Sequence, residues 1–160
     1  MIKLDRTLTY RLHLLHKLTD IESQRAYLDR AGLSMSDARC LTAVGSFAPL
    51  SVNDLAKKAN LDKGQASRAA QSLVDQGLVL KSASATDRRG VVLTLTPEGA
   101  TAWQRAMDVV SQRNKDIFGV LGKAGQAQLS ELFDRLIHTA RSSVDKLEVD
   151  SETTISEKTQ

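Results

Sequence analysis

One pair of strand-like segments interrupts a chain that is otherwise patterned for helices. The segments are residues 78–82 and 91–95, and the eight residues between them, ASATDRRG, carry three charges. Thr96 can cap a helix directly after the second segment, and Pro97 can fill its first position, where its missing N–H costs nothing. The sequence therefore predicts a short hairpin with a charged tip that leads straight into a helix.

Four helices are predicted before this hairpin from the three-to-four-residue spacing of apolar side chains. The first covers about residues 4–31 and ends at Gly32, and the second, opened by Ser36 with Asp37, covers about 36–45. The third covers 52–59 with Ser51 as its cap, and the fourth covers 63–76. A tight turn, Asn-Leu-Asp, joins them, and its aspartate can cap the fourth. Two short helices around a tight turn are typical of a helix-turn-helix, and a hairpin directly behind them makes it a winged helix.

Two more helices are predicted after the hairpin, which gives a mainly α (α+β) fold. One runs from Pro97 to about Leu121, a break follows over residues 122–125, and the other runs to about Leu147. We expect an N-terminal dimerisation helix, a winged helix-turn-helix DNA-binding lobe, C-terminal dimerisation helices, and a tail that is disordered because it has too few apolar residues to pack. The expected boundaries are 1–32 for the N-terminal helix, 33–99 for the DNA-binding lobe, 100–148 for the C-terminal helices and 149–160 for the tail.

The apolar faces of the terminal helices indicate a homodimer. They are too long for a winged-helix core of about 65 residues to cover. Left exposed, they would form an apolar patch larger than monomeric proteins tolerate. The alternative is that these helices pack only on each other within one chain.

The outer face of the helix predicted over residues 63–76 carries donors and acceptors that can reach base edges and phosphates in a DNA major groove. It carries no glutamate, and the surrounding residues 57–89 hold seven lysines and arginines against three aspartates. Double-stranded DNA is therefore the expected partner, with an ordinary solvated helix face as the alternative. The residues predicted to face the major groove are Lys63, Gln65, Ser67, Arg68, Gln71 and Ser72.

The charged tip of the hairpin, Asp87, Arg88 and Arg89, is also predicted to contact DNA. A guanidinium suits the narrow, electronegative minor groove. An aspartate two positions before it can orient it through a charge-assisted pair. The alternative is a surface salt bridge that only stiffens the hairpin.

Residues 33–99 resemble the MarR family of bacterial transcriptional regulators. The aspartate-x-arginine hairpin tip followed by leucine-threonine and glycine is fairly specific, and the long flanking helices match as well, so the resemblance covers nearly the whole chain. The matching motifs are Leu55-Ala56, Gly77-Leu78-Val79, Asp87-Arg88-Arg89 and the LTPEG of residues 95–99.

This resemblance implies a homodimeric winged-helix regulator whose first and last helices form the dimerisation region. It implies that Arg89 enters the minor groove and that Asp87 holds it there. Gln65, Ser67 and Arg68 stand where the family reads the major groove.

The resemblance also implies a small anionic, often aromatic, effector bound between the dimerisation helices and the DNA-binding lobe. We hypothesise that an aromatic acid or related catabolic intermediate releases a repressor from a pseudo-palindromic operator, with His13 or His16 donating to its oxygen. For the two histidines, a metal pair and ordinary polar positions are the alternatives; no third ligand stands near, and no metal is predicted. The candidate effector residues are Tyr10, Arg11, His13, His16, Ala38, Arg39 and Trp103.

Several other classes of protein do not fit the sequence. No apolar run approaches the roughly 18 residues that a membrane span needs, and the N-terminus has no signal-peptide pattern, so we expect a cytoplasmic protein. Cys40 is the only cysteine, and we expect it to be buried and inert rather than a redox switch. No catalytic motif indicates an enzyme, and no cofactor is predicted. The alternative class is a winged helix that binds protein, or DNA as an architectural nucleoid protein, without effector control.

Overall fold

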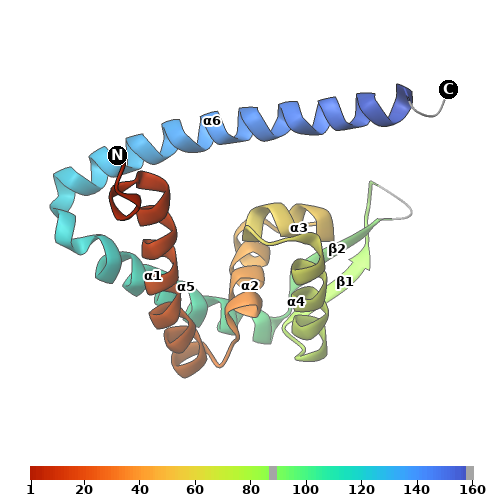
Figure 1. Ribbon diagram of the computed structural model, residues 1–160. Helices are drawn as coiled ribbons and strands as arrows, with labels where there is room; N and C mark the ends of the chain where they lie inside the picture. Colours follow the sequence, from red (N-terminus) through yellow and green to blue (C-terminus); the bar gives the residue numbers. More distant parts are fainter. Residues whose placement is uncertain (87–89, 158–160) are drawn as a thin grey trace. The chain divides into compact units, whose positions relative to one another are not determined.

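The computed structural model describes residues 1–86 and 90–157, with side chains described as far as residue 148 (Figure 1). The predicted hairpin tip, Asp87, Arg88 and Arg89, lies outside these residues. The chain divides into two compact units, residues 1–114 and the residues from 115 onward. The first unit contains every element of the predicted DNA-binding lobe.

The elements of the first unit follow the predicted order. A short turn of 3-10 helix, η1 (Leu4–Arg6), comes first. The helices are α1 (Leu8–Ala31), α2 (Met35–Phe47), α3 (Val52–Ala59), α4 (Lys63–Asp75) and α5 (Pro97–Phe118), the last turn of which belongs to the second unit. The strands are β1 (Val79–Ala83) and β2 (Val91–Leu95). This order confirms the winged helix-turn-helix fold.

Side-chain caps determine where α3 and α4 begin. The hydroxyl of Ser51 accepts a hydrogen bond from the backbone N–H of Asp54 at 3.1 Å. At α4, the Asp62 carboxylate accepts from the N–H of Gln65 at 2.7 Å, and the Gln65 side chain accepts from the N–H of Asp62 at 3.3 Å. Asn60 ends α3 in the left-handed conformation, with φ 54°. These contacts confirm the predicted caps and turn.

α2 differs from its prediction at both ends. Ser34, not Ser36, caps it, so the helix begins earlier than expected. It continues through Gly45 to Phe47. Gly45 lies inside the helix, where a Cβ would collide with the indole of Trp103. The glycine therefore makes room for an aromatic ring instead of ending the helix.

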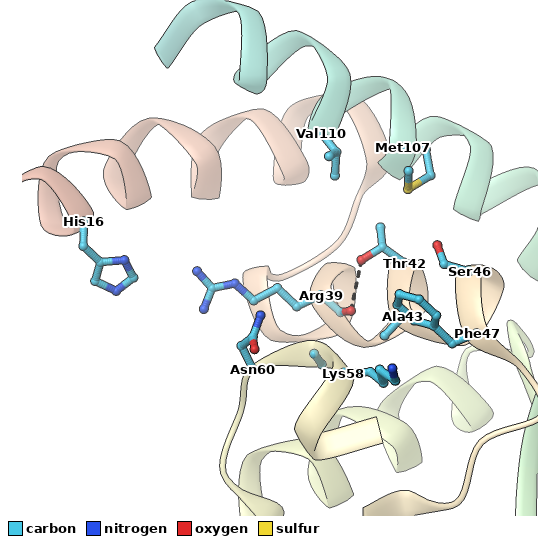
Figure 2. Close-up of a pocket in the computed structure, with 11 residues that line it drawn as sticks. His16, Arg39, Thr42, Ala43, Ser46, Phe47, Lys58, Asn60, Met107 and Val110 are labelled. Atoms are coloured by element: carbon cyan, nitrogen blue, oxygen red, sulfur yellow. Dashed lines mark hydrogen bonds between the residues drawn. The ribbon is translucent and has the colours of Figure 1, made fainter. Parts of the chain in front are cut away.

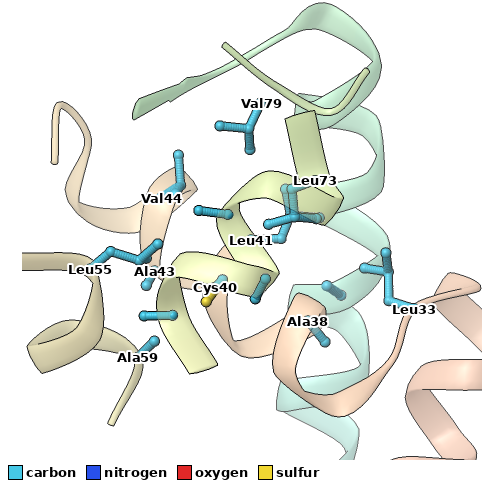
Figure 3. Close-up of a cluster of buried hydrophobic side chains, with 14 of the residues drawn as sticks. Leu33, Ala38, Cys40, Leu41, Ala43, Val44, Leu55, Ala59, Leu73 and Val79 are labelled. Carbon is cyan, nitrogen blue, oxygen red and sulfur yellow. The ribbon is translucent and has the colours of Figure 1, made fainter. Parts of the chain in front are cut away.

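α2, α3 and α4 pack around one apolar core (Figure 3). α4 faces this core with small side chains, Ala66, Ala69 and Ala70, which let it lie close to the neighbouring helices. Burial of each large aliphatic side chain stabilises the folded state by about 1.5–3 kcal/mol, so this core holds α4 in a fixed position on α2 and α3. The large side chains of this core include Leu41, Val44, Leu55, Leu73, Val79 and Leu93.

The two strands form an antiparallel hairpin that is fixed to the core at its base. Val79 pairs with Leu95, and Ala83 pairs with Val91. Leu93 also exchanges two backbone hydrogen bonds with Leu50, at 2.8 and 3.4 Å. The base of the hairpin is thus held to the segment between α2 and α3.

Thr96 and Gly99 join the hairpin to α5. The Thr96 hydroxyl donates to the carbonyl of Gly77 at 2.7 Å and accepts from the N–H of Gly99 at 2.8 Å. The N–H of Thr96 donates to the carbonyl of Leu78 at 3.1 Å. A Cβ at Gly99 would collide with that same carbonyl oxygen, so only glycine lets the backbones approach this closely. The Thr-Pro-Glu-Gly stretch therefore orients the hairpin on the helix that follows it.

Most of α1 contributes nothing to this core. Only Tyr27 and Ala31, near its C-terminal end, are buried. On the remainder, large apolar side chains are exposed to solvent. Those with the predicted helical spacing are Leu8, Leu12, Leu15, Leu18 and Ile21.

The second unit consists of the end of α5, a 3-10 turn, η2 (Gly119–Leu121), and α6 (Gly122–Glu157). The break predicted over residues 122–125 was wrong: α6 already begins at Gly122, and the interruption lies earlier, at η2. The backbone of α6 is helical to Glu157, whereas a disordered tail was predicted from residue 149. No glycine or proline follows Gly125, so the sequence contains no residue that would end the helix earlier. Within the described part of the chain, neither α6 nor any other helix is long and apolar enough to cross a membrane. The exposed apolar side chains of α6 are Leu132, Phe133, Leu136, Ile137, Val144 and Leu147.

Candidate DNA-binding surface and ligand pocket

The outer face of α4 carries exposed polar side chains. Lys63, Ser67 and Arg68 are exposed, as the sequence predicted for a surface that meets DNA. Gln65 is exposed too, but its side chain takes part in the cap of α4. Gln71 accepts from the ammonium of Lys81 on β1 at 2.8 Å, so this outer face is continued by a cation from the hairpin.

Ser72 departs from the predicted surface because its hydroxyl turns toward α2. It donates to a carboxylate oxygen of Asp37 at 2.8 Å, and the Gln76 amide donates to the same oxygen at 3.1 Å. Asp37 is only 9% exposed, so its carboxylate ties the end of α4 to the start of α2. Asp37 was expected only at the start of a helix, and nothing in the neighbouring sequence indicates this long-range contact.

The base of the hairpin tip is described on both sides of the three tip residues. The N–H of Ser84 donates to the carbonyl of Gly90 at 2.9 Å, and the N–H of Thr86 donates to the Ser84 hydroxyl at 3.3 Å. The roles predicted for Asp87, Arg88 and Arg89 fall outside the described residues and stay predictions.

A pocket of about 440 Å³ lies beside α2, within the first unit (Figure 2). Its walls come from α1, α2, α3 and α5, and from the turn that leads into α4. Among its described lining residues there is no acid. These residues are His16, Arg39, Thr42, Ala43, Ser46, Phe47, Lys58, Ala59, Asn60, Met107 and Val110.

The pocket combines cations with apolar and aromatic surface. The Lys58 ammonium lies 4.8 Å from the centre of the Phe47 ring, a distance typical of a cation–π contact. The Arg39 side chain extends between His16 and Asn60 (Figure 2). On the α1 side, a nitrogen of Arg39 lies 3.2 Å from Asp20, and His16 lies 3.3 Å from the same carboxylate. An anion with an apolar body could contact both the cationic side chains and the apolar surface of this pocket.

The structure brings only two of the seven predicted effector residues, His16 and Arg39, to this pocket. Tyr10, Arg11 and His13 lie on exposed turns of α1 and do not line it. Ala38, also predicted as an effector residue, is fully buried in the core and does not line the pocket.

Trp103 is likewise packed against Gly45 and does not line the pocket, and its indole N–H has no partner among the described residues. Phe47 and Lys58 line the pocket but were not among the predicted effector residues. The spacing of Thr42, Ala43, Ser46 and Phe47 after Arg39 follows one helix face, which was the available signal. No local signal places the end of α3 opposite that face.

Cys40 is completely buried, as predicted. Burial, and secondarily the nearby carboxylate of Asp37, raises the pKa of its thiol to about 12. The thiolate, which is the reactive form, is therefore disfavoured at neutral pH.

A recognition-type helix, α4, packs with α2 and α3 around one core and is followed by a hairpin, which is the arrangement of winged helix-turn-helix proteins. The sequence model of the MarR family matches residues 31–90. Solved structures with the same fold include MarR-family regulators that match over most of their length. The chain is therefore similar to MarR-family transcriptional regulators, in sequence over residues 31–90 and in fold over most of its length.

Three similar proteins illustrate the relationship. The transcriptional regulator BilQ of Clostridium symbiosum is 23% identical over 112 residues, which cover 70% of this chain and 78% of BilQ. A MarR/EmrR family regulator from Acinetobacter sp. ADP1 is 26% identical, with a TM-score of 0.78, covering 91% of this chain and 99% of that one. A Mycobacterium tuberculosis MarR family protein, solved with salicylic acid, is 26% identical, with a TM-score of 0.66, covering 82% and 97%.

Proposed function

We propose that this transcriptional regulator is a homodimeric repressor that binds a pseudo-palindromic operator and is released from it by a small aromatic acid. The observation that carries the ligand part is the pocket beside α2, which joins cations and aromatic surface and has no acid among its described lining residues. The DNA part rests on the polar outer face of α4 and on the family.

The exposed apolar side chains support the dimer. On α1 and, separately, on α6, large aliphatic and aromatic residues stand in solvent at helical spacing. Their burial against a second copy would supply a hydrophobic driving force that one isolated chain does not use. A symmetric dimer would present two copies of α4 to successive major grooves, roughly 34 Å apart.

The pocket supports an aromatic carboxylate as the ligand class. The guanidinium of Arg39 can pair with a carboxylate, and the Lys58 ammonium adds a second positive charge. Phe47 offers a ring face, and Met107 and Val110 offer apolar surface for the body of the ligand. The salicylic acid in the M. tuberculosis relative is a molecule of this chemical class.

The position of the pocket supports a link to DNA binding. Lys58 and Asn60 lie directly before the cap of α4, whereas Arg39 belongs to α2 and His16 to α1. A ligand that draws these groups together favours one placement of α4 over another, provided that it binds the two placements with different affinity.

Ligand binding is tested by a thermal-shift screen of aromatic acids, with salicylate included. We expect an acid to stabilise the wild-type protein, and we expect Arg39→Met and Lys58→Met to weaken its binding about ten-fold or more, since each removes a charge that faces the ligand. Lys57→Met is the matched control, because Lys57 is exposed on the same helix and does not line the pocket. Equal loss in all three variants would contradict a defined anion site, and so would the absence of any stabilising acid.

A further inference from the structure

One carboxylate already pairs with two of the cationic or basic side chains that line the pocket. Asp20, on α1, accepts hydrogen bonds from Arg39 at 3.2 and 3.5 Å through its two oxygens. The same carboxylate lies 3.3 Å from the imidazole of His16, one turn earlier on α1. Arg39 and His16 both line the pocket, and Asp20 itself does not.

The contact between Asp20 and Arg39 has the geometry of an exchangeable pair. Both of its described hydrogen bonds use a single guanidinium nitrogen, Nη2, so it lacks the two parallel bonds of the strongest arginine–carboxylate pairs. The side chains are also about one third exposed, 35% for Asp20 and 32% for Arg39. Ion pairs with this much solvent contact contribute little to stability, so another carboxylate can replace Asp20.

We propose that Asp20 is an internal competitor for the ligand: it neutralises Arg39 when the pocket is empty and is exchanged for the carboxylate of an incoming aromatic acid. This inference rests on the proposed function, because it concerns the same pocket. Asp20 then sets the affinity for anionic ligands, and its displacement undoes the only ion pair between α1 and α2 in the described part of the chain.

The competition makes a specific prediction about charge. Asp20→Asn keeps the shape of the side chain and removes its negative charge, so salicylate no longer competes with an anion for Arg39. We expect salicylate to bind Asp20→Asn about three- to ten-fold more tightly than the wild type. Salicylamide, which is neutral, should not gain affinity, and Asp20→Glu, which keeps the charge, should bind salicylate about as the wild type does.

Two further variants separate this competition from a general change in charge. Asp29→Asn removes the same charge from an exposed position on α1 and should leave salicylate affinity unchanged. In the double variant Asp20→Asn/Arg39→Met, the gain in salicylate affinity should disappear, because Arg39, the group for which Asp20 and salicylate compete, is absent. Isothermal titration calorimetry with the full chain measures all of these affinities.

The outcomes distinguish this inference from the proposed function. If salicylate binds the wild type and Asp20→Asn equally well, or if the gain persists without Arg39, the internal competitor is wrong while the ligand site stands. If neither salicylate nor any other aromatic acid binds either protein, the proposed ligand class fails, and the competitor fails with it.

Discussion

One added methyl group at Gly99 should lower the stability of the fold strongly. Gly99→Ala places a Cβ against the backbone carbonyl of Leu78, and no flexible side chain is there to move aside. We expect the free energy of unfolding to fall by about 2 kcal/mol or more, measured by urea denaturation. Gly119→Ala is the control: its Cβ would meet nothing within 4 Å, so its effect should stay within about 0.5 kcal/mol. Similar losses in the two variants would show that the close approach to Leu78 is unimportant.

Local chemistry predicted some individual residues and failed for others. Ser51, Asp62 and Thr96 could be predicted as caps because a cap needs only a short side chain and the backbone N–H groups that follow it. Ser72 could not be placed correctly, because its orientation depends on the buried carboxylate of Asp37, thirty-five residues away in the chain. Contacts of that kind arise from packing and leave no mark on the nearby sequence.

At the scale of the elements, α4 and the hairpin should contribute differently to DNA binding. Arg68→Ala, on the outer face of α4, should relax the preference for particular base pairs and cost about 1–3 kcal/mol on the specific site. Arg89→Ala, at the predicted tip, should weaken binding to all sequences and reduce the salt-dependence slope by about one. Binding to specific and random duplexes at several salt concentrations measures both effects.

Arg105→Ala serves as the control for this comparison, because it removes a positive charge from an exposed position on α5. It should leave base preference unchanged. If the Arg68 and Arg89 variants lost affinity for specific and random DNA in equal proportion, the division between helix and hairpin would be wrong.

The elements themselves were more predictable than the pocket between them. Apolar spacing and caps predicted the order of all the helices and strands, and errors were confined to ends such as that of α2, where Gly45 packs against Trp103 instead of stopping the helix. The pocket draws on four helices, so only its residues on a single face, such as Arg39 and Phe47, shared a periodic signal. Lys58 reaches it through the packing of α3 on α2, which no short stretch of sequence specifies.

At the scale of the whole molecule, the exposed apolar face of α1 should hold two copies together. Leu12→Glu with Leu15→Glu places charges on this face without touching the core, since both side chains are at least half exposed. In sedimentation equilibrium at micromolar concentration, we expect the wild type to have twice the 17.5 kDa mass of one chain and the variant to have the mass of one chain. Leu80→Glu, at an exposed position on β1, should remain dimeric. A monomeric wild type would contradict the proposal.

Release of the protein from a specific DNA site on addition of an acid shows whether a ligand in this pocket controls DNA binding. A duplex selected from random sequence by the wild-type protein is followed by fluorescence anisotropy while salicylate is added. We predict that the acid releases the duplex from the wild type, and that Arg39→Met needs at least about ten-fold more acid for the same release. Control of DNA binding by this pocket is wrong if Arg39→Met and the wild type release the duplex at the same acid concentration, or if the wild type stays bound at acid concentrations that saturate its pocket.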